Sequence, residues 1–256
     1  MNHLDLNEVC EYVNKRIVSF HEKRFAALTG LELKSLLKKN PYLFKAKNVE
    51  TANELIEGFL TARLSSAEEK FFGDFLEDLA IFIAGKTSGG HKSAAPGVDL
   101  EFIEGGIHYI VSIKSGPNWG NSDQQNKLEQ NLRDAVTRVK QSQFGANAQA
   151  VLGICYGKTR TNFLRGYLKV VGQNFWTLIS GNQDLYTEII EPIGYRAEEH
   201  NTLFKKRKNG LHNKLSVQFV QEFCDSSTGM IDWVRLVEYN SGNYDLDKLL
   251  AVNPEN

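Results

Sequence analysis

The chain has 256 residues, of which 41% are hydrophobic, and a formal net charge of −1. It is therefore long enough to bury one large core, and its overall charge does not mark it as a strongly basic binding protein. No apolar run approaches the roughly 20 residues that cross a bilayer, and the amino terminus lacks a signal-peptide pattern, so we expect a cytoplasmic protein without membrane contact. Its three cysteines, Cys10, Cys155 and Cys224, form no CxxC pair, which argues against a disulfide framework and a zinc ribbon.

The first part of the chain, residues 1–65, is predicted to be helical. Apolar residues recur there at helical spacing, as at Val9, Val13 and Ile17. This helical region is a candidate dimerisation element. A further helical run follows and carries the acidic residue Glu77 among its apolar positions.

Two runs of alternating residues, 98–104 and 107–114, are predicted to form a β-hairpin. They flank Gly105-Gly106, a pair that favours a two-residue turn between antiparallel strands. Such a turn pairs Glu104 with Ile107. Because successive residues of a strand point to opposite faces, each strand then has an apolar face and a second face that carries polar side chains.

The register set by this turn places Asp99 across from Ser112, with Lys114 one diagonal step away on the same face. Opposed side chains in such a ladder lie roughly 5 Å apart and diagonal ones about 7 to 8 Å. That gap suits one hydrated cation and a phosphate oxygen. A carboxylate is a hard oxygen ligand for magnesium, and a neighbouring ammonium orients water and balances charge on phosphorus. The hairpin therefore predicts a metal-dependent phosphodiesterase site.

An acid one strand before Ser112-Ile113-Lys114 resembles the PD-(D/E)xK core of type II restriction endonucleases. The resemblance implies that Asp99, the backbone carbonyl of Ile113 and a second acid bind one or two Mg²⁺ ions, for which Mn²⁺ substitutes. It also implies catalytic roles for Lys114 and Ser112. The serine departs from the commonest form of the motif, which has an acid there, so the second acid must come from elsewhere in the chain.

Two acids are candidates for the missing carboxylate. Glu77 lies on the helix before the hairpin, and Glu129 lies on a helix predicted for residues 122–144, whose apolar stripe includes Leu128 and Leu132. Among restriction endonucleases, either helix can supply the second acid. We favour Glu77 and keep Glu129 as the alternative.

The later elements complete the predicted fold. Strands are expected at 150–157 and 166–172 and a short helix at 175–181. This order predicts an α/β (α+β) restriction-endonuclease-like core in which a central mixed β-sheet is flanked by helices. The predicted domains are a helical region at 1–65, the nuclease core at 66–195 and a helical region at 196–256 packed on the core.

The same order, with Asn40-Pro41 upstream, resembles a subgroup of restriction endonucleases that cut interrupted palindromes of the GG-N-CC type. The resemblance implies cleavage of double-stranded DNA to 5′-phosphate ends and a companion DNA methyltransferase. A palindromic target matches a two-fold symmetric protein, so we expect a homodimer.

Candidate DNA contacts lie in polar and basic segments outside the hairpin, because lysine and arginine bind phosphates and arginine pairs well with guanine edges. A glycine-rich segment, 88–97, is a further candidate to reach DNA. The candidate contact residues are Asn118, Trp119, Lys158, Arg160, Lys205, Lys206, Arg207 and Lys208.

Two other functions fit the same residues. The chain is alternatively a repair nuclease that is non-specific or recognises DNA structure, or a DNA-binding module of this fold that has lost activity, as Ser112 would allow. Discrete fragments would exclude the first alternative, and cleavage of any kind would exclude the second.

Overall fold

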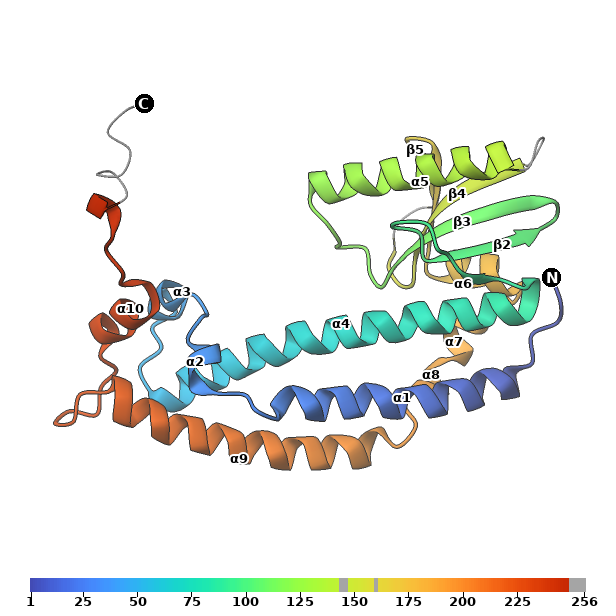
Figure 1. Ribbon diagram of the computed structural model, residues 1–256. Helices are drawn as coiled ribbons and strands as arrows, with labels where there is room; N and C mark the ends of the chain where they lie inside the picture. The colour runs from blue at the N-terminus through green and yellow to red at the C-terminus, as the bar shows by residue number, and fades with distance from the viewer. Residues whose placement is uncertain (143–146, 159–160, 249–256) are drawn as a thin grey trace. The chain divides into compact units, whose positions relative to one another are not determined.

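The computed structural model describes residues 1–142, 147–158 and 161–248, and the chain forms two compact units. Unit 1 consists of Met1–Lys23 and Glu69–Ala197, and unit 2 consists of Arg24–Glu68 and the described part of Glu198–Asn256. Two long helices, α1 (Leu6–Leu28) and α4 (Ala52–Ser88), contribute to both units (Figure 1). The division into 1–65, 66–195 and 196–256 stays a prediction.

The six described strands all lie in unit 1, which also contains helices, whereas the elements described in unit 2 are helices and one isolated β-bridge. Within the described residues, we find no helix with the length and apolar character needed to span a membrane. The remaining elements are α2 (Leu33–Leu36), α3 (Pro41–Ala46), β1 (His91–Lys92), β2 (Leu100–Glu104), β3 (Ile107–Lys114), α5 (Ser122–Ser142), β4 (Asn147–Ile154), β5 (Asn162–Leu164), β6 (Tyr167–Val171), α6 (Gln173–Ser180), α7 (Leu185–Glu188), α8 (Ile190–Ile193), α9 (Ala197–Phe223) and α10 (Trp233–Ser241).

The described strands form one six-stranded mixed sheet in the order β1-β2-β3-β4-β6-β5. The first three strands pair antiparallel, β4 lies parallel to both β3 and β6, and β5 closes the other edge antiparallel. Helix α5 makes the crossover between the parallel strands β3 and β4, as such a connection requires. The predicted central mixed sheet is therefore confirmed.

The β2–β3 hairpin has the predicted register. Gly105 and Gly106 have φ angles of +59° and +75°, which a two-residue primed turn needs and which glycine adopts without a Cβ clash. Glu104 pairs with Ile107, and the ladder continues to the pair Leu100 and Val111. One step further, the Asp99 amide donates to the Val111 carbonyl at 2.9 Å, so Asp99 lies opposite Ser112.

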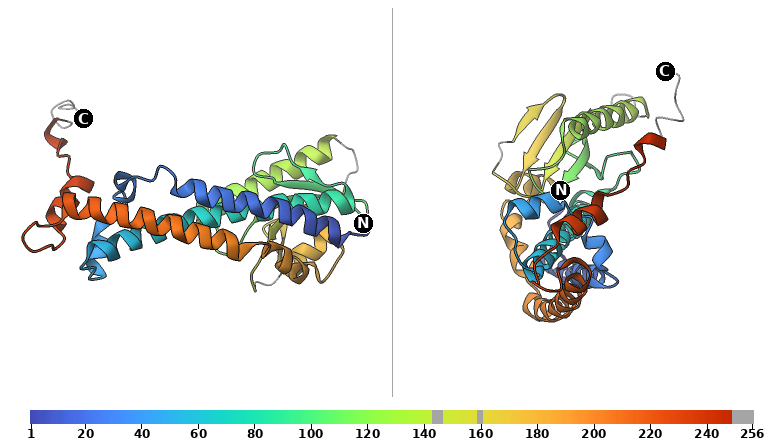
Figure 2. Two further views of the ribbon diagram at one scale, coloured as in Figure 1. Left: turned by 90° about the horizontal axis from the view of Figure 1, so that it is seen from below. Right: turned by 90° about the vertical axis from the view of Figure 1, so that its left-hand side faces the viewer.

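Helices cover both faces of the sheet, α5 on one side and α4 on the other (Figures 1 and 2). The two faces can be followed along β3, where Val111 and Ile113 belong to the cluster that includes α1, α4 and α6, and Ile110 belongs to the cluster that includes α5. Strands buried on both faces in this way are typical of parallel sheets in α/β proteins. The fold is the predicted α/β layer arrangement, with Ser112 buried beneath α5.

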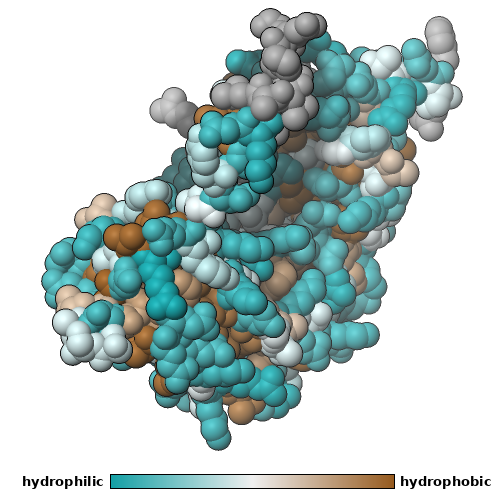
Figure 3. All heavy atoms as spheres, turned by 60° about the vertical axis from the view of Figure 1, so that its left-hand side comes forward, coloured by the Kyte–Doolittle hydropathy of each residue, from teal (hydrophilic) through white to brown (hydrophobic). Residues whose placement is uncertain are grey.

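Unit 2 has its own helical core. Asn40 caps α3 by accepting hydrogen bonds from the amides of Tyr42 and Leu43, and Thr51 with Glu54 forms a reciprocal capping box at the start of α4. Hydrophobic residues are exposed among hydrophilic ones on the surface seen in Figure 3. The core of unit 2 includes Leu36, Leu55, Phe59, Leu215, Phe219 and Leu236.

Candidate functional site

The carboxylate of Asp99 is held by the neighbouring strand. It accepts a hydrogen bond of 2.6 Å from the backbone amide of Ile113 and a longer one of 3.3 Å from the hydroxyl of Ser112. The antiparallel register brings these two donors to Asp99, because Ser112 lies opposite Asp99 and Ile113 follows Ser112 along the same strand. Asp99 and Ser112 therefore meet, as the sequence predicts.

Lys114 lies at the same end of the hairpin. Its ammonium donates to the backbone carbonyl of Ile113 at 3.0 Å and lies 5.6 Å from the centre of the Trp119 ring, within the range of a cation–π interaction. Trp119 belongs to the loop that joins β3 to α5. The structure thus joins Asp99 and Lys114 through the two polar atoms of one peptide residue, Ile113.

A hollow of about 400 Å³ opens beside Ser112 and Lys114. One wall is formed by α5, whose polar residues at helical spacing line the hollow. The sequence shows this polar face, but many solvated helix faces have the same pattern, so it did not identify these residues as part of a site. The lining residues are Gly97, Ser112, Lys114, Trp119, Gly120, Gln124, Lys127, Leu128 and Asn131.

Glu77 reaches the same site from α4. One helical turn before it, Gly73 lies against Ser115, the residue that follows Lys114, since a Cβ added to Gly73 would lie 3.6 Å from the Ser115 hydroxyl. Burial first, and the negative charge of Asp99 second, raise the pKa of Glu77 above its usual 4.5. The two carboxylates are therefore close enough to repel each other.

Lys92 is a site residue whose role the sequence analysis missed. Its ammonium lies 3.1 Å from a carboxylate oxygen of Glu77, and this contact raises the pKa of Lys92. The sequence places the residue only in a glycine-rich segment, because a strand of two residues, β1, has no periodic pattern. Nothing in the sequence indicates that Lys92 and Glu77 meet.

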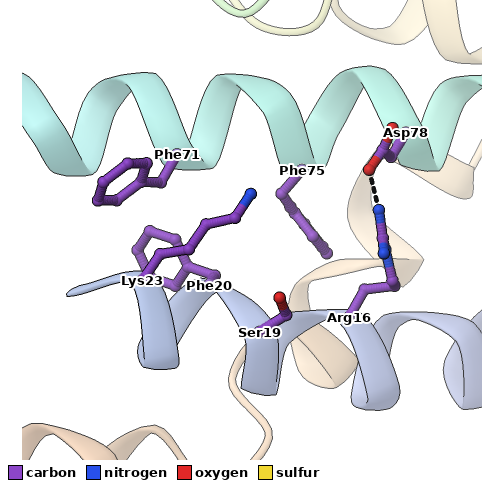
Figure 4. Close-up of a pocket in the computed structure, with 7 residues that line it drawn as sticks. All are labelled: Arg16, Ser19, Phe20, Lys23, Phe71, Phe75 and Asp78. Carbon is purple, nitrogen blue, oxygen red and sulfur yellow. Dashed lines mark hydrogen bonds and ion pairs between the residues drawn. The ribbon is translucent and has the colours of Figure 1, made fainter. Parts of the chain in front are cut away.

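Asp78, the residue after Glu77, forms a contact with α1. Figure 4 shows Arg16 and Asp78 pointing toward each other across the gap between α1 and α4, where they form an ion pair. Asp78 is also a smaller cause of the raised pKa of Glu77. A separate small hollow, lined by Arg16 and Asp78, also holds Lys23, whose ammonium lies 6.0 Å from the centre of the Phe71 ring. Arg16 therefore offsets part of the negative charge that surrounds Glu77.

Glu129, the alternative second acid, has different partners. It lies on α5 and accepts a hydrogen bond of 2.7 Å from Arg133, one helical turn away, and Arg165 lies 3.7 Å from its other oxygen. The pKa of Tyr167 is raised mainly by burial and, to a smaller extent, by the negative charge of Glu129. Glu129 therefore pairs with two arginines, whereas Glu77 interacts electrostatically with Asp99.

The oxygen donors suit a hard divalent cation. Two mutually repelling carboxylates, Asp99 and Glu77, favour a bound positive charge, and magnesium prefers such ligands. Among the described residues, no group of three or more His, Cys, Asp or Glu side chains is arranged to hold a metal ion. A third protein donor would therefore be a backbone group. The carbonyl of Ile113 is the candidate, because the amide of the same residue bonds Asp99 and the carbonyl itself accepts from Lys114.

The predicted DNA contacts are distributed over both units. Asn118 and Lys158 are exposed in loops of unit 1 that follow β3 and β4, whereas Arg160 lies outside the described residues. The basic run on α9 belongs to unit 2. There, Lys208 pairs with Glu57 at 2.6 Å and Arg207 lies 5.5 Å from the ring of Phe25. The other two members of that run, Lys205 and Lys206, are exposed.

A protein-family model described as type II restriction endonuclease EcoO109I matches residues 7–201, which is more than half of the chain. The chain belongs to this family. As a type II restriction endonuclease, it acts on DNA and cuts it at specific sites. No curated protein matches the chain closely enough to count as a relative.

The raised pKa of Glu77 predicts a pH-dependent stability of the endonuclease. Ionising this carboxyl destabilises the folded state, an effect absent below the ordinary pKa of 4.5 and complete once the pH exceeds the raised folded-state pKa. We therefore expect Glu77→Gln, in the absence of metal, to gain melting temperature relative to the wild type as the pH rises from 4.5 to about 8.

Thermal denaturation monitored by circular dichroism measures this difference. Glu69→Gln, an exposed change on the same helix, is the matched control and should track the wild type at both pH values. A Glu77→Gln protein whose melting temperature falls relative to the wild type over this range would contradict the electrostatic description of the site.

Proposed function

We propose that this endonuclease hydrolyses double-stranded DNA in a Mg²⁺-dependent reaction, at a short palindrome, leaving 5′-phosphate ends. The observation that carries the proposal is the meeting of Asp99 and Lys114 at Ile113, beside a hollow lined by polar side chains. A carboxylate and an ammonium so placed are what hydrolysis of a phosphodiester requires: a metal ligand and a cation beside the reacting phosphate.

In the proposed site, Asp99, Glu77 and the carbonyl of Ile113 would hold the metal. When bound, Mg²⁺, or Mn²⁺ in its place, would supply positive charge that stabilises the transition state at phosphorus and at the leaving oxygen. The peptide amide of Ile113 fixes Asp99, and Trp119 fixes the ammonium of Lys114 from its ring face. Lys114 positions the attacking water and balances negative charge as it develops.

Ser112 serves the site in place of an acid. It is 1% exposed, and its hydroxyl donates to Asp99, so it orients that carboxylate without adding negative charge. The acid that the commonest motif has at this position is then supplied by Glu77, with Glu129 as the alternative. The coupling of Glu77 to Asp99 favours the first assignment.

DNA would approach the hollow beside Lys114. Trp119 lines it, the exposed Asn118 precedes Trp119 in the same loop, and Lys127 adds a second cation from α5. Phosphates attract such cations, and polar loop residues read base edges. We propose further contacts at Lys158 and Arg160, after β4, and at Lys205, Lys206, Arg207 and Lys208.

The proposed target is a palindrome of the GG-N-CC type, and its symmetry calls for two active sites related by a two-fold axis. We therefore propose a homodimer. In unit 2, α3 and α10 contact each other, and both expose apolar residues: Leu43 is 49% exposed and Val234 is 69% exposed. Apolar residues exposed on neighbouring elements suit an interface with a second copy.

The solution mass tests the dimer. Light scattering coupled to size-exclusion chromatography should give twice the 28.9 kDa of one chain. Val234→Asp should shift the protein toward a single chain, because burying a charge in an apolar interface is costly. The exposed polar change Gln221→Asp on α9 is the control. A wild-type protein with the mass of one chain at micromolar concentration would rule the homodimer out.

Digestion of a sequenced phage genome tests activity and target together. With Mg²⁺, the wild type should give discrete fragments whose mapped ends share one short palindrome and carry 5′-phosphates. Lys114→Ala should cut about 10²- to 10⁴-fold more slowly, since it removes the group that positions and activates water. Lys140→Ala, an exposed change on α5, is the control.

Each other outcome of the digestion favours a different function. A smear of fragments would favour the non-specific or structure-specific nuclease, and tight binding without cleavage under any divalent metal would favour the inactive module. Near wild-type cleavage by a folded Lys114→Ala protein would remove the assigned site. The proposed companion methyltransferase predicts that DNA from cells that carry it resists this digestion.

Calorimetric titration with Ca²⁺ tests the metal ligands. Asp99→Ala should weaken binding by at least about tenfold, since changes even around a metal's direct ligands have effects of this size. Glu77→Gln should have a similar effect if it is the second acid, whereas Glu129→Gln should leave the affinity unchanged. The reverse pattern would transfer the role to Glu129, and unchanged binding by Asp99→Ala would remove the site itself.

A further inference from the structure

One cation, Lys92, contacts an acid of the proposed metal site directly. Its ammonium lies 3.1 Å from a carboxylate oxygen of Glu77. The Lys92 side chain is 66% exposed, whereas that of Glu77 is 27% exposed. The contact therefore joins a largely exposed ammonium to a largely shielded carboxylate.

The backbone explains why Lys92 reaches this position. Strand β1 pairs with β2 so that Lys92 lies opposite Leu100, the residue after Asp99. The next residue, Ser93, donates its amide to the carbonyl of Asp99 at 3.2 Å. The strand that brings the ammonium to Glu77 is thus tied to the other acid, which makes the contact a product of the sheet rather than of a free surface side chain.

The charges around this contact distinguish it from an ordinary surface ion pair. Glu77 and Asp99 repel each other, and Lys92 is the positive partner of Glu77. A second ammonium, that of Lys114, bonds the carbonyl of Ile113 at 3.0 Å. Two of the oxygens assigned to the metal, one on Glu77 and one on Ile113, are therefore occupied by lysine ammonium groups.

We propose that Lys92 is a stand-in for the metal ion: it holds Glu77 in the metal-free protein and must release this carboxylate before a divalent cation binds. The inference rests on the proposed function, because it takes Glu77 as a metal ligand. Lys92 lowers metal affinity in two ways: it competes for the same oxygen, and its charge repels an incoming cation.

Calcium titration by calorimetry at about pH 8 measures the competition without any cleavage assay. Removing the charge in Lys92→Gln should strengthen Ca²⁺ binding about two- to fivefold, the range expected when one partly exposed ion pair no longer has to be broken. Lys92→Met, which keeps the aliphatic stem, should do the same. Lys92→Arg keeps the charge and should bind Ca²⁺ within about twofold of the wild type.

Lys86→Gln is the matched control. It removes one positive charge from α4, where Lys86 pairs with Glu8 at 2.9 Å, and leaves the pair of acids untouched. Its calcium affinity should equal that of the wild type. If Lys86→Gln strengthens binding as much as Lys92→Gln does, the effect is one of net charge and the stand-in role is wrong.

The same titrations separate this inference from the function on which it rests. If Asp99→Ala loses calcium binding while both neutral Lys92 variants bind like the wild type or more weakly, the metal site stands and the role of Lys92 is overturned. If Asp99→Ala binds calcium like the wild type, the proposed metal site itself fails. Thermal denaturation of each variant confirms that the proteins compared are folded.

Discussion

The hydrogen bond between the Ile113 amide and the Asp99 carboxylate is the contact on which the site depends. It exists only because β2 and β3 pair in one register, and a slip of one residue would turn every side chain of one strand to the other face. The apolar pattern resists such a slip, since Val111 and Ile113 are buried on the side of α4. Burial of the core thus fixes the geometry of the proposed site.

Around this contact the protein gathers positive and negative groups in nearly matched numbers. Asp99, Glu77 and Asp78 supply the negative charge, and Arg16 and Lys92 each pair with one of these acids. Half-buried carboxylates repel one another unless cations lie beside them. The overall net charge of −1 therefore gives no measure of the local charge at the proposed site, where we expect charge to govern the binding of a metal and of DNA.

The hairpin could be predicted because its signals are local. Gly105-Gly106 and a period of two residues define turn, faces and register within twenty positions, so the meeting of Asp99 with Ser112 followed from counting. Lys92 could not be found in this way, because a two-residue strand has no period and its partner, Glu77, lies on a helix outside the hairpin. The extent of α4 was also missed, because Leu55 and Phe59 lie in one hydrophobic cluster and Leu79 and Ile83 in another, so the helix has no single apolar stripe.

The two ends of the hairpin have separate tasks. Asp99 and Lys114 lie at the open end, whereas an added Cβ at Gly105 or Gly106 would meet no atom within 4 Å. The turn thus borders free space and contributes no side chain to the chemistry. It is a natural place to splice in a fluorescent or affinity tag, because lengthening the loop leaves the ladder between Leu100 and Val111 intact.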